Sequence, residues 1–259
     1  AGNHGERHRF ETGVFQAMRD PLNDSRGFTL TELVMAVAVG LVLLAAVSTA
    51  MVSGQRSATG IERKVTTNQD ARAALEIMAA EIRMASFNST LEPNLWRNPG
   101  DCTISGNQNW RGIQEATATS ITVEMDIESP PTKVCGDTSG EIIRYEASGQ
   151  GITRHVITCV SGVRNLDSQP FLGPIAGHPE VRTVECANCV INHALPVFRY
   201  FDGTGAEILH ANLPNDIPRI RRIEIALLVR SADIDPNTGQ QRQMAYSTSV
   251  IPRNHGIHF

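Results

Sequence analysis

Glu32 has the most unusual setting of any residue in this sequence, because it is a lone carboxylate at the start of a long apolar run. It follows Gly27 and Phe28 closely, and no charged residue occurs from position 33 to position 52. A helix of about 20 such residues rises about 30 Å, the thickness of a bilayer's hydrocarbon core. The run is therefore predicted to span a membrane. If Glu32 enters apolar surroundings, its charge costs free energy unless the carboxylate pairs with a cation. The alternative is that Glu32 stays solvated at the membrane surface.

Five cysteines form a second group of reactive side chains: Cys102, Cys135, Cys159, Cys186 and Cys189. All lie beyond the apolar run, where a translocated head meets an oxidising compartment, so two disulfides and one remaining thiol are expected. A bridge from Cys102 to Cys135 is one candidate, because it would tie a loop to a predicted sheet. The Cys186-x-x-Cys189 pair has no second matching pair for zinc and no βαβ pattern for redox exchange. We expect a structural disulfide within that pair, or from one of its members to Cys159.

A loop near the end of the chain alternates oxygen-bearing side chains at Asp233, Asp235 and Asn237, followed by Gly239. Alternating oxygens around one centre suit a hard cation such as calcium. The spacing departs from the EF-hand pattern, and the same residue types favour a plain turn. Calcium and a simple turn both remain open at this loop, and no other cofactor is expected.

Motifs for catalysis and for nucleic-acid binding are absent from the sequence. It contains no Gly-x-Ser-x-Gly, no His-Glu-x-x-His and no phosphate-binding glycine loop. The net charge is −4, and lysines and arginines form no block. An enzyme and a nucleic-acid partner are therefore not expected.

The elements that position these residues begin with one long helix. Residues 61–87 carry an apolar stripe at helical spacing, which includes Ile61, Val65, Leu75, Met78 and Ile82. No proline occurs between residues 28 and 92, so nothing forces a break in the helix. The apolar run is therefore predicted to continue as one helix to residue 87.

The rest of the chain has a strand pattern. Alternating apolar residues predict strands at 119–127, 141–146, 152–160, 197–201, 207–210, 218–230 and 241–251, the last two as a hairpin. Residues 88–112 and 161–192 are predicted loops, and Trp96 and Trp110 are expected to pack the first loop onto the domain rather than to face a partner. The fold class is α+β: a long N-terminal helix with a membrane half and an amphipathic half, packed on an antiparallel β-sheet head.

The sequence from Gly27 to Glu32 and the apolar run after it resemble the class III signal of type IV prepilins and pseudopilins. The resemblance implies that a prepilin peptidase cuts after Gly27 and methylates the amine of Phe28. It also implies that Glu32 pairs with the N-terminal amine of a neighbouring subunit. The chain then divides into a leader (1–27), a membrane and filament-core half-helix (28–53), an amphipathic half-helix (54–87) and a head (88–259).

Residues 71–85 and the closing residues 250–254 are similar to PilW-type minor pilins. Many major pilins carry a helix-loosening proline in the membrane segment, which this sequence lacks. The resemblance implies a low-abundance subunit that primes or caps a type IV pilus, first held in the inner membrane with a periplasmic head and later part of the pilus at the cell surface. Its implied partners are other minor pilins, the major pilin, the assembly platform and a tip adhesin. The alternatives are a minor pseudopilin of a type II secretion system and, third, a membrane-anchored enzyme.

Overall fold

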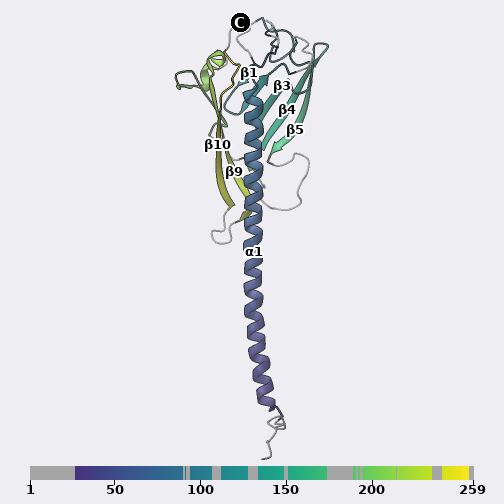
Figure 1. Ribbon diagram of the computed structural model, residues 1–259, viewed down its shortest axis with the longest axis vertical. Helices are drawn as coiled ribbons and strands as arrows, with labels where there is room; N and C mark the ends of the chain where they lie inside the picture. Colours follow the sequence, from purple (N-terminus) through teal and green to yellow (C-terminus); the bar gives the residue numbers. More distant parts are fainter. Residues whose placement is uncertain are drawn as a thin grey trace, which may run out of the picture. The chain divides into compact units, whose positions relative to one another are not determined.

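The computed structural model describes residues 27–89, 91, 94–106, 112–127, 134–148, 151–173, 189–190, 192, 195–213, 215–234 and 241–256. Contacts divide the chain into two compact units, Ala1–Gln55 and Arg56–Phe259, and each is described by itself. The boundary falls inside a single helix, α1 (Leu30–Arg83). The second unit contains the last part of α1 and all of the strands (Figure 1).

The unbroken helix predicted from the sequence is confirmed, but its predicted end at residue 87 is about one turn too late. The helix ends at Arg83. The next two residues form hydrogen bonds of the 3-10 type, in which Met84 N–H donates to the Glu81 carbonyl and Ala85 N–H donates to the Ile82 carbonyl. Ser86 then takes a positive φ of 65°, which turns the chain out of the helix. Gly112 passes so close to Ser86 that a Cβ at that position would collide with the Ser86 backbone.

The first sheet has the order β1-β2-β3-β4-β5, with every neighbouring pair antiparallel. Its strands are β1 (Ile113–Ala116), β2 (Ser120–Glu124), β3 (Ile142–Ser148), β4 (Gly151–Val160) and β5 (Val163–Leu172). Three of these match predicted strands, whereas β1 was not predicted. The prediction of a loop over 161–192 is wrong for β5, which pairs with β4 along its length.

The second sheet has the order β10-β9-β7-β8, and β6 pairs with β9. Its strands are β6 (Cys189–Val190), β7 (Phe198–Phe201), β8 (Glu207–Ile208), β9 (Arg222–Ile234) and β10 (Gln241–Val250). The predicted hairpin of the two long strands is confirmed by the antiparallel β9–β10 pairing. The start of the first of these strands is corrected, because Ile217–Arg219 form a 3-10 turn, η3, before β9 begins. The α+β fold is therefore confirmed, with two antiparallel sheets in place of the one expected.

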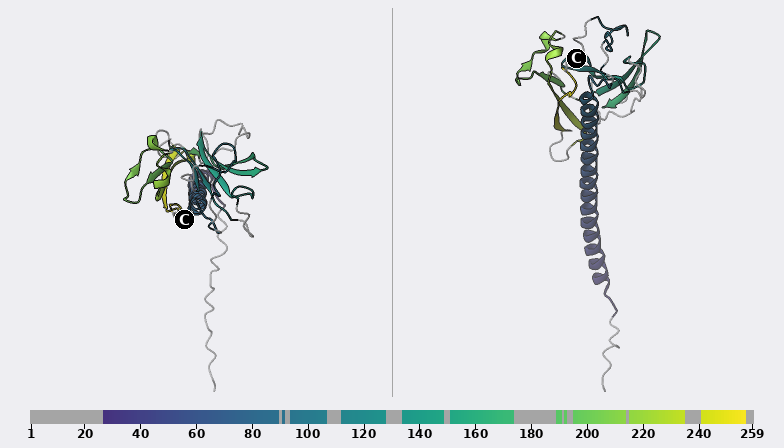
Figure 2. Two further views of the ribbon diagram at one scale, coloured as in Figure 1. Left: turned by 90° about the horizontal axis from the view of Figure 1, so that it is seen from above. Right: turned by 45° about the horizontal axis from the view of Figure 1, so that its top comes forward.

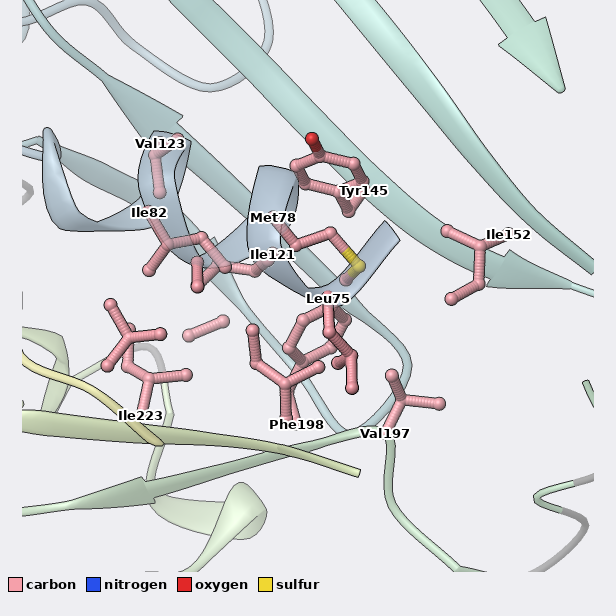
Figure 3. Close-up of a cluster of buried hydrophobic side chains, with 14 of the residues drawn as sticks. Leu75, Met78, Ile82, Ile121, Val123, Tyr145, Ile152, Val197, Phe198 and Ile223 are labelled. Carbon is pink, nitrogen blue, oxygen red and sulfur yellow. The ribbon is translucent and has the colours of Figure 1, made fainter. Parts of the chain in front are cut away.

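The last turns of α1 lie between the two sheets (Figure 2, left). Leu75, Met78 and Ile82 project into one buried cluster with side chains of both sheets, among them Tyr145 and Phe198 (Figure 3). The buried helix face begins at Ala71 and recurs every three or four residues. Ile61 and Val65, which the predicted stripe included, are instead exposed.

A second, smaller core covers the outer face of the first sheet. Leu95 and Trp96 from the segment after α1 pack against residues of β3 and β4 in this cluster. Trp96 is therefore buried on the domain as predicted, whereas Trp110 lies outside the described residues. Leu95 and Trp96 thus hold this part of the segment against the sheet.

Candidate functional site

The predicted processing junction lies immediately before α1. Gly27, Phe28 and Thr29 are not helical, and α1 begins at Leu30. The Phe28 side chain is 90% exposed, and Gly27 is exposed as well. The described residues of the junction are therefore non-helical and exposed within their own unit.

Thr29 and Glu32 form a reciprocal cap on the first turn of α1. The Glu32 backbone N–H donates to Thr29 Oγ1 at 3.3 Å, and the Thr29 N–H donates to Glu32 Oε2 at 3.0 Å. The Thr29 hydroxyl also donates to the same carboxylate oxygen at 3.0 Å. This is the capping box of a Thr-x-x-Glu sequence, in which each side chain satisfies a backbone donor of the other residue. The Thr29-x-x-Glu32 spacing is the signal in the sequence that indicates this cap.

The helix surface beyond Glu32 is apolar and uncovered by its own chain. Leu30–Glu62 is long and apolar enough to cross a membrane, and none of its most apolar window is buried. Leu43, for example, is 60% exposed. A surface of this kind needs lipid or other apolar helices as its surroundings.

The head carries a disulfide between Cys102 and Cys159, with Cα atoms 5.6 Å apart. The predicted Cys102–Cys135 bridge is therefore wrong, and so is a bridge from Cys159 to Cys186 or Cys189. Strand β4 brings Cys159 under the segment that holds Cys102, while the Cys135 thiol is buried beside them and donates to the Met125 carbonyl at 3.4 Å. Burial raises the pKa of Cys135, so this thiol stays protonated and unreactive.

Several predicted site residues fall outside the described part of the chain. Cys186, Asp235 and Asn237 lie there entirely, and only the backbones of Cys189 and Asp233 are described, in β6 and β9. Among the described residues, no group of three or more His, Cys, Asp or Glu side chains is arranged to hold a metal ion. The Cys186–Cys189 disulfide and the calcium loop therefore remain predictions.

Two buried carboxyl groups in the head have perturbed acidities. Glu124 is fully buried, and burial raises its pKa to about 8 although the Arg97 N–H and the Gln114 amide both donate to it. Burial also raises the pKa of Glu141, which accepts from the Gly136 N–H at 2.8 Å. Both groups accept backbone hydrogen bonds from segments beside the first sheet, and both lie near the buried Cys135 thiol.

In comparison with known families, residues 22–48 match the prokaryotic N-terminal methylation motif. The matched stretch contains Gly27, Phe28, the capped Glu32 and the start of the uncovered helix. The motif supports a type IV pilin or pseudopilin. No match was found among curated proteins or among solved structures.

Such a motif implies processing by a prepilin peptidase and partners within a pilus-type system. Together with the apolar helix, it is consistent with anchoring in a membrane and with a location in a pilus at the surface. It also favours a structural role over catalysis. A protein of the pilin or pseudopilin type would need both properties of the first unit. One is an exposed junction, and the other is an apolar helix surface that its own chain leaves uncovered.

Proposed function

We propose that this chain is a minor pilin, a low-abundance structural subunit that primes the assembly of a type IV pilus or caps its tip. The observation that carries the proposal is the methylation motif at the head of an uncovered apolar helix. The minor-pilin assignment is supported further by the resemblance of residues 71–85 and 250–254 to PilW-type proteins. The helix α1 also runs without a proline, unlike many major pilins.

The first step of this function is removal of the leader. The peptidase cuts between Gly27 and Phe28, and the new amine of Phe28 is methylated. The head then stands in the periplasm with the helix in the inner membrane, until the assembly platform moves the subunit into the pilus. Mass spectrometry of the native protein should detect an N-terminal peptide that starts with a methylated Phe28. An intact leader, or a cut elsewhere, would contradict the proposal.

In the assembled pilus, Glu32 pairs with the N-terminal amine of a neighbouring subunit. A carboxylate among packed apolar helices needs such a partner, because an unpaired charge in these surroundings is costly. The same carboxylate also caps its own helix, so its two roles must be separated by experiment.

Three variants separate these roles. Glu32→Gln keeps an oxygen for the capping box but removes the charge, Thr29→Ala removes the cap but keeps the charge, and Glu32→Ala removes both. Both Glu32 variants should remain in the membrane and fail to enter pili, whereas Thr29→Ala should still enter. Normal pilus entry of Glu32→Gln would show that the charge is not needed.

A minor pseudopilin of a type II secretion system would share the same motif and the same processing. Deletion of the chain in its natural host separates the two functions. We expect loss of pili and of twitching motility with normal release of exoproteins. Loss of exoprotein release with normal twitching would assign the chain to secretion instead. The same strain, complemented by head variants, can identify contacts with other minor pilins, the major pilin or a tip adhesin.

A further inference from the structure

The head contains a cavity of about 460 Å³ that borders the first sheet. Its lining brings together β1, β2, β3, β5, the turn at Pro99, and the 3-10 turn η2 (His210–Asn212) with the residue after it. Arg144 and Arg164 supply cations, Glu115 an anion, and Pro99, Ala116 and Leu213 apolar surface. The volume lies within the range of small-molecule sites, and charged groups beside apolar surface are typical of them.

The two arginines of this cavity differ in the ion pairs that they form. Arg144 already has two carboxylate partners, with its Nε 3.4 Å from Glu115 Oε2 and its Nη2 3.5 Å from Glu146 Oε2. Glu115 in turn accepts from the Ser120 hydroxyl at 2.9 Å and from the Thr122 hydroxyl at 3.0 Å. The Arg144–Glu115 ion pair therefore forms one wall of the cavity.

Among the described residues, Arg164 is a cation of the cavity lining that forms no ion pair. Its guanidinium donates to the Pro99 carbonyl. Partial burial and then the charge of Arg144 lower the pKa of Arg164, so its surroundings disfavour the positive charge. The buried Glu124 nearby does not compensate at neutral pH, since its pKa is raised to about 8 and it is mainly protonated.

We propose that this cavity binds a small organic anion with one carboxylate, which pairs with Arg164 while its body lies against Pro99, Ala116 and Leu213. A guanidinium presents two parallel donors that match a carboxylate. A carboxylate carries a single negative charge, which matches the single positive charge of Arg164 better than a phosphate does, whose charge at pH 7 is about −1.5 to −2. The apolar part of the lining makes no favourable contact with an inorganic ion, whereas it can pack against the carbon atoms of an organic ligand.

The test uses the full chain in detergent micelles, labelled with ¹⁵N, and follows the Nε–H resonances of Arg144 and Arg164. The probes are acetate, benzoate and glucuronate, each with its neutral counterpart (acetamide, benzamide and glucose), and inorganic phosphate. We expect at least one carboxylate to shift these resonances in a saturable way and its neutral counterpart to leave them unchanged. Loss of a charge-assisted hydrogen bond should weaken binding by about tenfold to 100-fold in Arg164→Gln, followed at Arg144.

Two further variants make the result specific. Arg253→Gln removes an exposed arginine outside the cavity lining and should bind as the wild type does. Arg164→Lys keeps the charge and should bind more tightly than Arg164→Gln; unchanged tryptophan fluorescence in each variant shows that the head is folded. The proposal is overturned if none of the three carboxylates binds, if a neutral counterpart binds equally well, if phosphate alone binds, or if Arg164→Gln binds like the wild type.

Discussion

The two ends of helix α1 differ in what covers them. Near its start the side chains are apolar on every side and are exposed to an unusual degree, as at Leu43, which is 60% exposed. Near its end the apolar residues occupy one face, and Ile82 is fully buried between two sheets. The head therefore supplies its own apolar surroundings, while the start of the helix depends on lipid or on other chains. The two ends of α1 therefore have different roles: its end stabilises the fold of the head, and its start packs against lipid or other chains.

The largest expected effect tests this difference directly. Ile82→Ala should lower the free energy of unfolding of the head by about 2–5 kcal/mol, because it leaves a cavity between α1 and both sheets. Leu43→Ala removes a similar side chain from the exposed end and should change the same quantity by less than about 0.5 kcal/mol. Denaturant unfolding followed by tryptophan fluorescence measures both. Equal losses would show that the two ends are not independent.

Removal of the disulfide comes next in size. The double variant Cys102→Ala/Cys159→Ala should cost about 2–4 kcal/mol in the same measurement, because the bridge closes a long loop within the head. Cys135→Ala is the control and should cost less, since that thiol is unpaired. Peptide mapping after alkylation of the folded protein should recover Cys102 linked to Cys159 and leave Cys135 unmodified until the chain unfolds. A peptide linking Cys102 to Cys135 would contradict the structure.

A pH dependence should follow from Glu124. Its pKa rises from an ordinary value of 4.5 to about 8 in the folded head, so the folded chain keeps a proton that the unfolded chain releases. Stability from this group is therefore greatest at low pH and falls as the pH rises from about 5 to about 8. The slope should approach 1.4 kcal/mol per pH unit.

Glu124→Gln is the matched control for this pH dependence. It should remove the contribution of Glu124 to the slope and leave the helical signal of the exposed end unchanged. Stability that rises with pH over this range in the wild type would contradict the assigned direction.

The smallest expected effect concerns the exposed end itself. Thr29→Ala removes the cap and should destabilise the first turn of α1 by about 1 kcal/mol. Hydrogen exchange at the amides of Glu32 and Leu33 should then be about fivefold faster, while exchange within residues 71–83 is unchanged. Thr31→Ala is the control, because its hydroxyl contacts Thr29 but no backbone donor. Faster exchange along the whole helix would mean that its two ends are coupled.

Local patterns were enough to predict the helix and the long hairpin. The apolar run at the start of α1 is evident from composition, and β9 and β10 alternate clearly along their length. Strand β5 was missed because it lies at an edge, is exposed on most of both faces and contains Pro170. Its pairing with β4 comes from backbone hydrogen bonds, which leave no apolar pattern in the sequence. Strand β1 is only four residues long and gives no usable period.

The candidate sites also differ in whether a local sequence pattern predicts them. The junction at Gly27 and Phe28 and the carboxylate of Glu32 are contiguous in sequence, so a motif identifies them. The partner of Cys102 depends on which strand passes beneath its loop, which the spacing of the cysteines does not determine. The cavity at Arg164 combines side chains from distant parts of the chain and could not be foreseen from any local pattern.

The last described residues of the chain bear on when the head can fold. The His255 ring donates from Nε2 to the Ile217 carbonyl at 2.8 Å, and its Nδ1 lies 3.0 Å from the Ser86 hydroxyl where the chain leaves α1. Contacts between residues 169 positions apart form only after the entire stretch from Ser86 to His255 has been made. A head that is held together by contacts this far apart cannot complete its fold before residue 255 has been synthesised.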